Sequence, residues 1–155
     1  NIYLNADALS VYTSTMSHDP VCSGLMFSDM VIREQGTGKL SLIGVFSQFN
    51  APGFPFTAPP FYVTAFLTNF QGKVESIELT IRVEESKSAH VLGSVHGTVN
   101  ISPDAPPFEK HVVIEFPVQI PPARFPEQGI YFVVVLIDGN EVNRRSINIR
   151  SVTGK

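Results

Sequence analysis

Residues 130–149 read IYFVVVLIDGNEVNRRSINI, and this stretch decides the fold. Two apolar-rich runs flank Asp138-Gly139-Asn140, where Gly139 accepts the positive φ of a tight hairpin turn without a Cβ penalty. Residues 132–137 are apolar on both faces, which is typical of a central strand that is covered on both sides. The stretch therefore predicts a β-hairpin inside a sheet.

A second hairpin is predicted near the start of the chain. Residues 26–46 read MFSDMVIREQGTGKLSLIGVF, and the turn formers of residues 35–39 separate two apolar runs. Gln71-Gly72-Lys73 predicts another tight turn between the strands on either side of it. No long helical pattern competes with these signals between residues 24 and 150.

Strict alternation marks three further strands. Residues 75–83, 90–101 and 109–118 alternate apolar and polar side chains, as half-buried strands do. About eight strands follow at roughly ten-residue spacing, which indicates an all-β, antiparallel, immunoglobulin-like β-sandwich. Two sheets are expected to enclose Leu42, Ile77, Leu79, Ile81, Val91, Val95, Val112, Ile114, Phe116, Phe132 and Val134.

One tyrosine supports the immunoglobulin-like assignment. Tyr131 follows Gly129 by two residues at the start of the strongest strand. This arrangement is that of a tyrosine corner, in which the phenol bonds back to nearby backbone. The alternative is a tyrosine that merely begins a strand.

Composition bounds the class of protein. The 155 residues carry a net charge of -3 and a single cysteine, Cys22, so no intrachain disulfide can form. Without a broad basic field or an apolar run of about 18 residues, we expect neither nucleic-acid binding nor a membrane span. We expect a β-sandwich domain at 24–155, preceded at 1–23 by an arm or extension, and a cytoplasmic location, although a removed signal peptide stays open.

Three patches of the sequence resemble a known family. They are GKLSLIGVF at residues 38–46 with Pro55-Phe56 downstream, FPEQGIY at 125–131, and LIDG at 136–139. Together they resemble a family of small, uncharacterised bacterial proteins, a domain of unknown function, over residues 24–150. The resemblance implies a β-sandwich and a bacterial source, and it supplies no catalytic or ligand residues.

The best candidate for a binding site is the loop of residues 50–60. It holds four prolines together with Phe54 and Phe56, and Phe61 follows it. Prolines reduce the entropy lost on ordering, so Phe54, Pro55, Phe56 and Phe61 could form a recognition surface. The alternative is a stiff crossover whose phenylalanines cap the core.

The remaining chemistry is dispersed. His90, His96, His111 and Glu115 are weak metal candidates, because His90 and His96 lie about 20 Å apart along one strand. No catalytic residue and no cofactor is predicted. We expect a non-catalytic interaction or structural module of a bacterial protein, with a protein partner or self-association; the alternatives are a small-ligand or carbohydrate-binding sandwich and, less favoured, a histidine-based metalloprotein. Self-association is expected to involve residues 1–20 on a sheet edge.

A single substitution tests the predicted inward face of residues 75–83. Replacing Ile81 by Asp should abolish cooperative folding, because an unpaired charge would be buried. Circular dichroism during heating is the measurement. A normal melting transition in the Ile81→Asp variant would show that this face of the strand is not buried.

Overall fold

The structure, a computed structural model, describes residues 19–152. All of its regular structure is strand. The strands are β1 (Val21–Arg33), β2 (Leu40–Phe46), β3 (Gln48–Ala51), β4 (Phe56–Thr57), β5 (Phe61–Thr68), β6 (Ser76–Glu85), β7 (Val91–Asn100), β8 (Ile114–Ile120), β9 (Arg124–Phe125), β10 (Gly129–Ile137) and β11 (Asn140–Ser151). Eight of them have seven residues or more, which agrees with the expected number.

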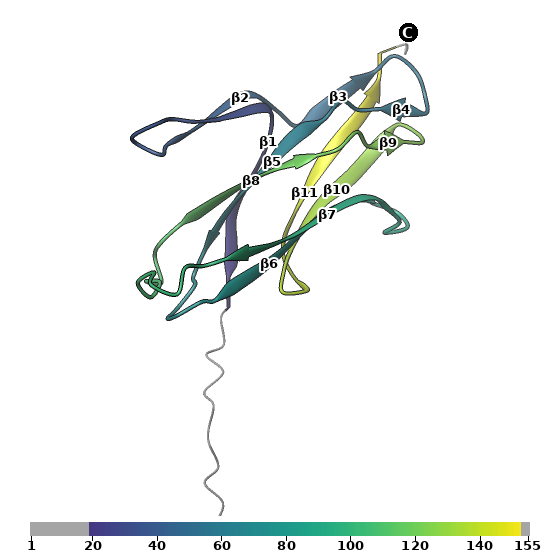
Figure 1. Cartoon of the computed structure of the whole chain (residues 1–155). Coiled ribbons are helices and arrows are strands. Elements are labelled where there is room, and N and C mark those ends of the chain that lie inside the picture. Colours follow the sequence, from purple (N-terminus) through teal and green to yellow (C-terminus); the bar gives the residue numbers. More distant parts are fainter. Residues whose placement is uncertain (1–18, 153–155) are drawn as a thin grey trace, which may run out of the picture.

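Two main sheets form the sandwich (Figure 1). Sheet A has the order β2-β1-β5-β8, and sheet B has the order β3-β11-β10-β6-β7. All neighbours are antiparallel except β3, which runs parallel to β11. The two-stranded pair β4-β9 closes one end. The predicted antiparallel β-sandwich is therefore confirmed.

Both predicted hairpins are present. The β10–β11 turn places Asp138 at φ 49° and Gly139 at φ 81°, the two positive values that a type I′ turn requires. The turn between β1 and β2 is closed by the Glu34 amide, which donates to the Lys39 carbonyl at 2.9 Å. Gln71-Gly72-Lys73 does not close a hairpin, because β5 and β6 belong to different sheets.

Phenylalanines fill much of the space between the sheets. Phe27, Phe61 and Phe125 are fully buried, and Phe61 lies edge-on to Phe46 and Phe49 at centroid distances of 5.6 Å and 5.5 Å. Edge-to-face pairs of this kind add about 0.5–1.5 kcal/mol to the area they bury. The aromatic cluster joins β1, β2, β3 and β5 into one core.

The predicted core is correct for β6 and only partly correct elsewhere. Ile77, Leu79 and Ile81 are buried, and Val95, Ile114 and Phe116 pack against the core. Three expectations were wrong: Leu42 and Val112 lie outside the core, and Phe132 lies on the outer face of sheet B. Val134 is fully buried as expected, but on the outer side of sheet B, in alternation with the core residues Val133 and Val135.

The prediction that Val91 faces the core was also wrong, because a register shift separates Val83 from Glu84 in the β6–β7 ladder. The shift exposes Val91 and turns its neighbour Leu92 toward the core. Such bulges change which side chain faces inward without leaving a local signal in the alternation.

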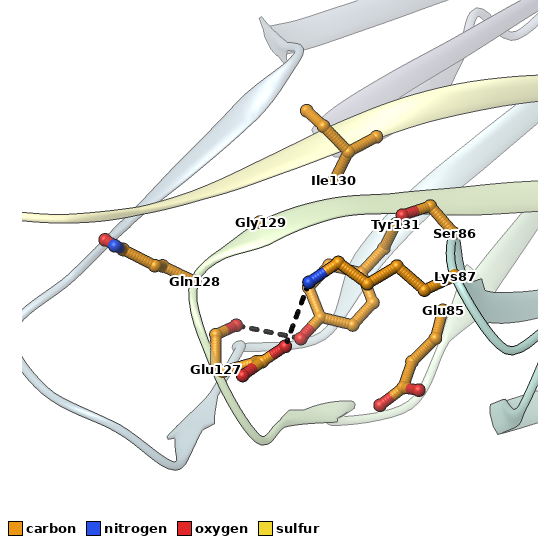
Figure 2. Close-up of a pocket in the computed structure, with 8 residues that line it drawn as sticks. All are labelled: Glu85, Ser86, Lys87, Glu127, Gln128, Gly129, Ile130 and Tyr131. Atoms are coloured by element: carbon orange, nitrogen blue, oxygen red, sulfur yellow. Dashed lines mark hydrogen bonds and ion pairs between the residues drawn. The ribbon is translucent and has the colours of Figure 1, made fainter.

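The tyrosine corner is present. The Tyr131 hydroxyl donates to the Glu127 carbonyl at 2.8 Å (Figure 2). The Tyr131 ring lies edge-on to the Phe125 ring, with 4.8 Å between the ring centroids. The bond ties the loop after β9 to the start of β10. This feature and the two-sheet arrangement make the fold immunoglobulin-like.

Side chains of β11 cross the sandwich to the edge of β1. Asn143 donates to the Cys22 carbonyl at 3.0 Å, and the Arg145 guanidinium donates to the Leu25 carbonyl at 2.5 Å. Arg145 also lies 4.9 Å from the Phe27 ring centroid. Because β2 pairs with β1 only from Phe27 onward, these contacts occupy the part of the β1 edge that β2 leaves free.

Removing the tyrosine-corner bond should cost measurable stability. Tyr131→Phe keeps the ring and leaves the Glu127 carbonyl without this donor, so we expect a loss of about 1–2 kcal/mol. Urea unfolding followed by fluorescence measures it. Equal stability of the Tyr131→Phe variant and the wild type would contradict a stabilising corner.

Candidate functional site

The structure distributes the Pro/Phe-rich loop between core and surface. Phe61 is buried, Phe54 and Phe56 are half-buried against the core, and Pro55 is exposed. The Phe56 ring stacks on Phe125 at 6.4 Å. These contacts fit the alternative in which the loop is a stiff crossover whose phenylalanines cap the core. Of the four candidate residues, Pro55 is the one exposed to solvent.

Pro55 borders an open groove of about 540 Å³ at this end of the sandwich. Glu85, His90 and Arg124 are the ionisable residues of its lining. The backbone N–H of His90 bonds to Ser88 Oγ at 3.1 Å. Residues of both charge signs line this groove, so its lining favours neither an anion nor a cation.

The histidines lie in separate surroundings. His96 Nδ1 lies 2.9 Å from Thr80 Oγ1, and His111 Nε2 lies 3.1 Å from the Glu109 carboxylate. Glu115 lies on β8, opposite Phe66. Within residues 19–152, no group of three or more His, Cys, Asp or Glu side chains could hold a metal ion.

The small pocket beside the tyrosine corner has a volume of about 40 Å³ (Figure 2). It lies between the β6–β7 turn and the start of β10, where Lys87 Nζ is 3.9 Å from the Glu127 carboxylate. Burial raises the pKa of Tyr131, and the hydrogen bond to Glu127 opposes that rise. A pocket of this size holds about one water and no organic ligand.

A two-stranded ribbon is the most unusual surface feature. β1 pairs with β5 only from Val21 to Ser28 and with β2 from Phe27 to Arg33. Residues 29–45 therefore form a ribbon with which no other strand of residues 19–152 pairs, and Figure 1 shows it projecting from the sandwich. An isolated pair of strands is marginally stable in water, so a ribbon of this kind gains from any surface that covers it.

One face of this ribbon is apolar and open. Met30 and Ile32 of β1 and Ile43 and Val45 of β2 are 51%, 47%, 47% and 50% exposed. Met30 pairs with Ile43, so the four side chains stand on the same side. We call these four residues the ribbon face.

The ribbon face continues onto the outer face of sheet A. Strand alternation places Met26, Tyr62, Phe66 and Pro117 on that side, all of them half-buried. We call these four residues the sheet A patch. Among the described strand residues on this side, Glu115 is the only one that is charged at neutral pH.

The outer face of sheet B has the opposite character. Arg82 Nε lies 2.5 Å from the Glu84 carboxylate, and Arg144 lies 2.6 Å from Glu141. The bond from Arg144 lowers the pKa of Glu141. Arg144 also covers the Phe132 ring at 5.3 Å. Charged side chains thus cover the apolar groups of sheet B, whereas the apolar groups of sheet A stay open.

Gly44 sets the shape of the ribbon. Its φ is 68°, in the left-handed region that favours glycine, and a Cβ added there would collide with the Asp29 side chain. Gly44 therefore lets Asp29 pack against the backbone of the neighbouring strand. This contact lies where the ribbon leaves sheet A.

Sequence reasoning did not identify the ribbon face. The signal was present, because residues 40–45 are apolar on both faces in a segment flanked by a polar turn. An apolar segment of this kind predicts a core strand, and the prediction places Leu42 in the core. Nothing local in the sequence says that the third strand stops pairing at Ser28.

Two facing sheets, a tyrosine corner and an exposed apolar ribbon define an immunoglobulin-like β-sandwich. Residues 23–150 match a family model, and the chain belongs to this family of unknown function, DUF6941. The resemblance seen in the sequence, to a small β-sandwich family, is thereby confirmed.

Comparisons with curated proteins and with solved structures complete the picture. No curated protein matches the chain. One similar solved structure is an immunoglobulin-like protein from Pseudomonas aeruginosa, with 12% identity, a TM-score of 0.36, and coverage of 85% of this chain and 97% of that one. Another is the alkylpurine DNA glycosylase AlkC of Pseudomonas fluorescens, bound to DNA with an abasic site analog, with 11% identity and a TM-score of 0.37. The match covers 81% of this chain but only 30% of the glycosylase. Among the described residues, no helix is long and apolar enough to cross a membrane.

The lone cysteine should be unreactive in the folded protein. Cys22 is 6% exposed and its Sγ donates to the Gly24 carbonyl at 3.1 Å; burial raises the thiol pKa. Because the thiolate is the reactive form, we expect slow reaction with Ellman's reagent at pH 8 and fast reaction in denaturant. The protonated thiol stabilises the fold below its ordinary pKa, and this contribution falls as pH rises through the raised value. Equal reaction rates in the folded and unfolded protein would contradict a buried thiol.

Proposed function

We propose that the protein is a non-catalytic structural module that self-associates. Its docking surface is the ribbon face together with the sheet A patch, and the occupant is the same surface of a second copy. The main support for this proposal is that Met30, Ile32, Ile43 and Val45 are about half exposed on one side of a ribbon that pairs with no further strand within residues 19–152.

Charge supports a second copy as the partner. A two-fold interface brings the same patch together with itself, so it must be self-complementary. A patch with net charge would repel its own copy, whereas this one is neutral apart from Glu115 on the edge strand β8. The charged outer face of sheet B offers no comparable neutral surface.

The available area also supports association. Four strands about 4.8 Å apart and a β1 strand about 43 Å long give a face of roughly 600 Å² on each copy. The two copies would then bury about 1,200 Å², at the lower end of the range for specific interfaces. We further place this module in the bacterial cytoplasm, in keeping with its buried and unpaired Cys22.

Introducing two lysines into the ribbon face tests the proposed dimer interface. In the double variant Met30→Lys/Ile43→Lys, four lysines would meet across the two-fold interface, where like charges cost several kcal/mol. We expect the wild type to be a dimer and this variant a monomer, with a Kd raised more than about a hundredfold. Light scattering coupled to size exclusion is the measurement, and circular dichroism checks the fold.

The matched control adds the same charges elsewhere. Val91 and Val152 are 41% and 59% exposed and lie outside the docking surface, so Val91→Lys/Val152→Lys should remain a dimer. A wild type that is monomeric at about 0.1 mM would refute self-association. A dimer that survives Met30→Lys/Ile43→Lys would place the interface on another surface.

A further inference from the structure

We infer that the cleft between β7 and β8 binds an extended, uncharged peptide segment of a partner protein, which adds as a strand to the free edge of β7. The cleft has a volume of about 210 Å³ and opens between the edges of the two sheets. Its apolar lining comprises Leu79, Ile81, Val95, Val99, Phe116 and Val118. The last four are only half-buried, so the core itself reaches the surface here.

Gly97 creates the room in this cleft. It lies between Val95 and Val99 in the inward-facing row of β7 and pairs with Leu79. A Cβ built on Gly97 would meet nothing within 4 Å. One side chain is therefore missing from the inner row, and an apolar side chain from outside the domain can take its place.

The two edges beside the cleft differ in their capacity to pair. β8 contains Pro117, which lacks an N–H and sits on an edge strand as a proline must. β7 is ten residues long and contains no proline, lysine or other charged residue. Edge strands in natural proteins normally carry such protection against pairing. An incoming strand would thus pair with β7 and not with β8.

Charge complementarity identifies the kind of partner. The cleft lining contains no Asp, Glu, Lys or Arg, and the Nδ1 atom of its one histidine, His96, lies 2.9 Å from Thr80 Oγ1. A charged side chain inserted there would be buried without a counter-ion. The chemistry that fits is an extended segment with apolar side chains at alternate positions, the mode known as β-augmentation.

The cleft and the proposed docking surface meet at Pro117, which lines the cleft and belongs to the sheet A patch. The strand that the peptide would pair with, β7, belongs to sheet B and carries no residue of the docking surface. The ribbon face lies at the opposite end of sheet A from β8. The dimer test changes Met30 and Ile43 and the peptide test changes Gly97, so the two tests give separate answers.

The probe is a capped seven-residue peptide in which threonine alternates with valine, titrated against the full chain. Its control is the same peptide with lysine in place of the central valine. We expect the apolar peptide to bind and the lysine peptide to bind at least about tenfold more weakly. Nuclear magnetic resonance shifts measure affinity, and hydrogen exchange of the β7 amides reports strand pairing.

Two glycine variants make the test specific. Gly97→Thr would fill the gap in the cleft and should weaken the apolar peptide at least about tenfold without lowering the melting temperature. Gly93→Thr is the matched control, since Gly93 lies on the same strand, has the same open Cβ space and does not line the cleft. It should bind the peptide as the wild type does.

Three results would overturn the inference. They are no binding of the apolar peptide up to about 1 mM, equal binding by Gly97→Thr and the wild type, and binding that leaves the β7 amides unprotected. The third result would indicate a pocket for small apolar molecules in place of a strand-pairing site.

Discussion

The contact of Arg145 with β1 is the interaction on which the rest of the architecture depends. A guanidinium that points into a sandwich must find acceptors, because an unpaired buried charge is costly. Arg145 donates to the Leu25 carbonyl and lies over the face of the Phe27 ring. Asn143, two residues before Arg145 on β11, donates to the Cys22 carbonyl. Side chains from sheet B thereby bond to the backbone of β1 between Cys22 and Leu25, before the part of β1 that pairs with β2.

The same edge of β1 is divided between sheet B and β2. Asn143 and Arg145 contact it at Cys22 and Leu25, and β2 pairs with it from Phe27 onward. On the opposite edge of β1, the pairing with β5 ends at Ser28. Residues 29–45 are therefore left as a two-stranded ribbon. Inward-pointing charged residues such as Arg145 are a known means of preventing further strands from adding to a sheet.

The sandwich thus presents two neutral surfaces of different kinds. At one end of sheet A the exposed surface is a face, made of side chains from β1 and β2. The second surface is an edge of sheet B, the backbone of β7 beside a gap left by Gly97. Side-chain packing suits a second copy, whereas backbone pairing suits an extended peptide.

The sequence predicted what local patterns determine. The positive φ demanded at Gly139, the alternation of Ile77 to Val83 and the bonding of Tyr131 each depend on a few neighbouring residues, and each was predicted correctly. Phe132 and Val134 were placed between the sheets because a central strand is apolar on both faces and its pattern cannot say which face is inside.

The candidate surfaces could not be predicted because they depend on contacts between distant segments. Ile43 is exposed because β5 stops pairing with β1 at Ser28. The cleft at Gly97 lies between β7 and β8, two strands that belong to different sheets. The Phe56 side chain was ambiguous for the same reason, since its burial depends on Phe125, far along the chain.

The most direct measurement of the central claim is the solvent accessibility of methyl groups in the associated protein. A soluble paramagnetic agent broadens methyl resonances that water can reach. In the isolated chain the side chains of Met30 and Val91 are 51% and 41% exposed, so both methyl signals should broaden to a similar extent. If a second copy covers the ribbon face, Met30 stays sharp while Val91 broadens. Equal broadening of Met30 and Val91 would contradict the account.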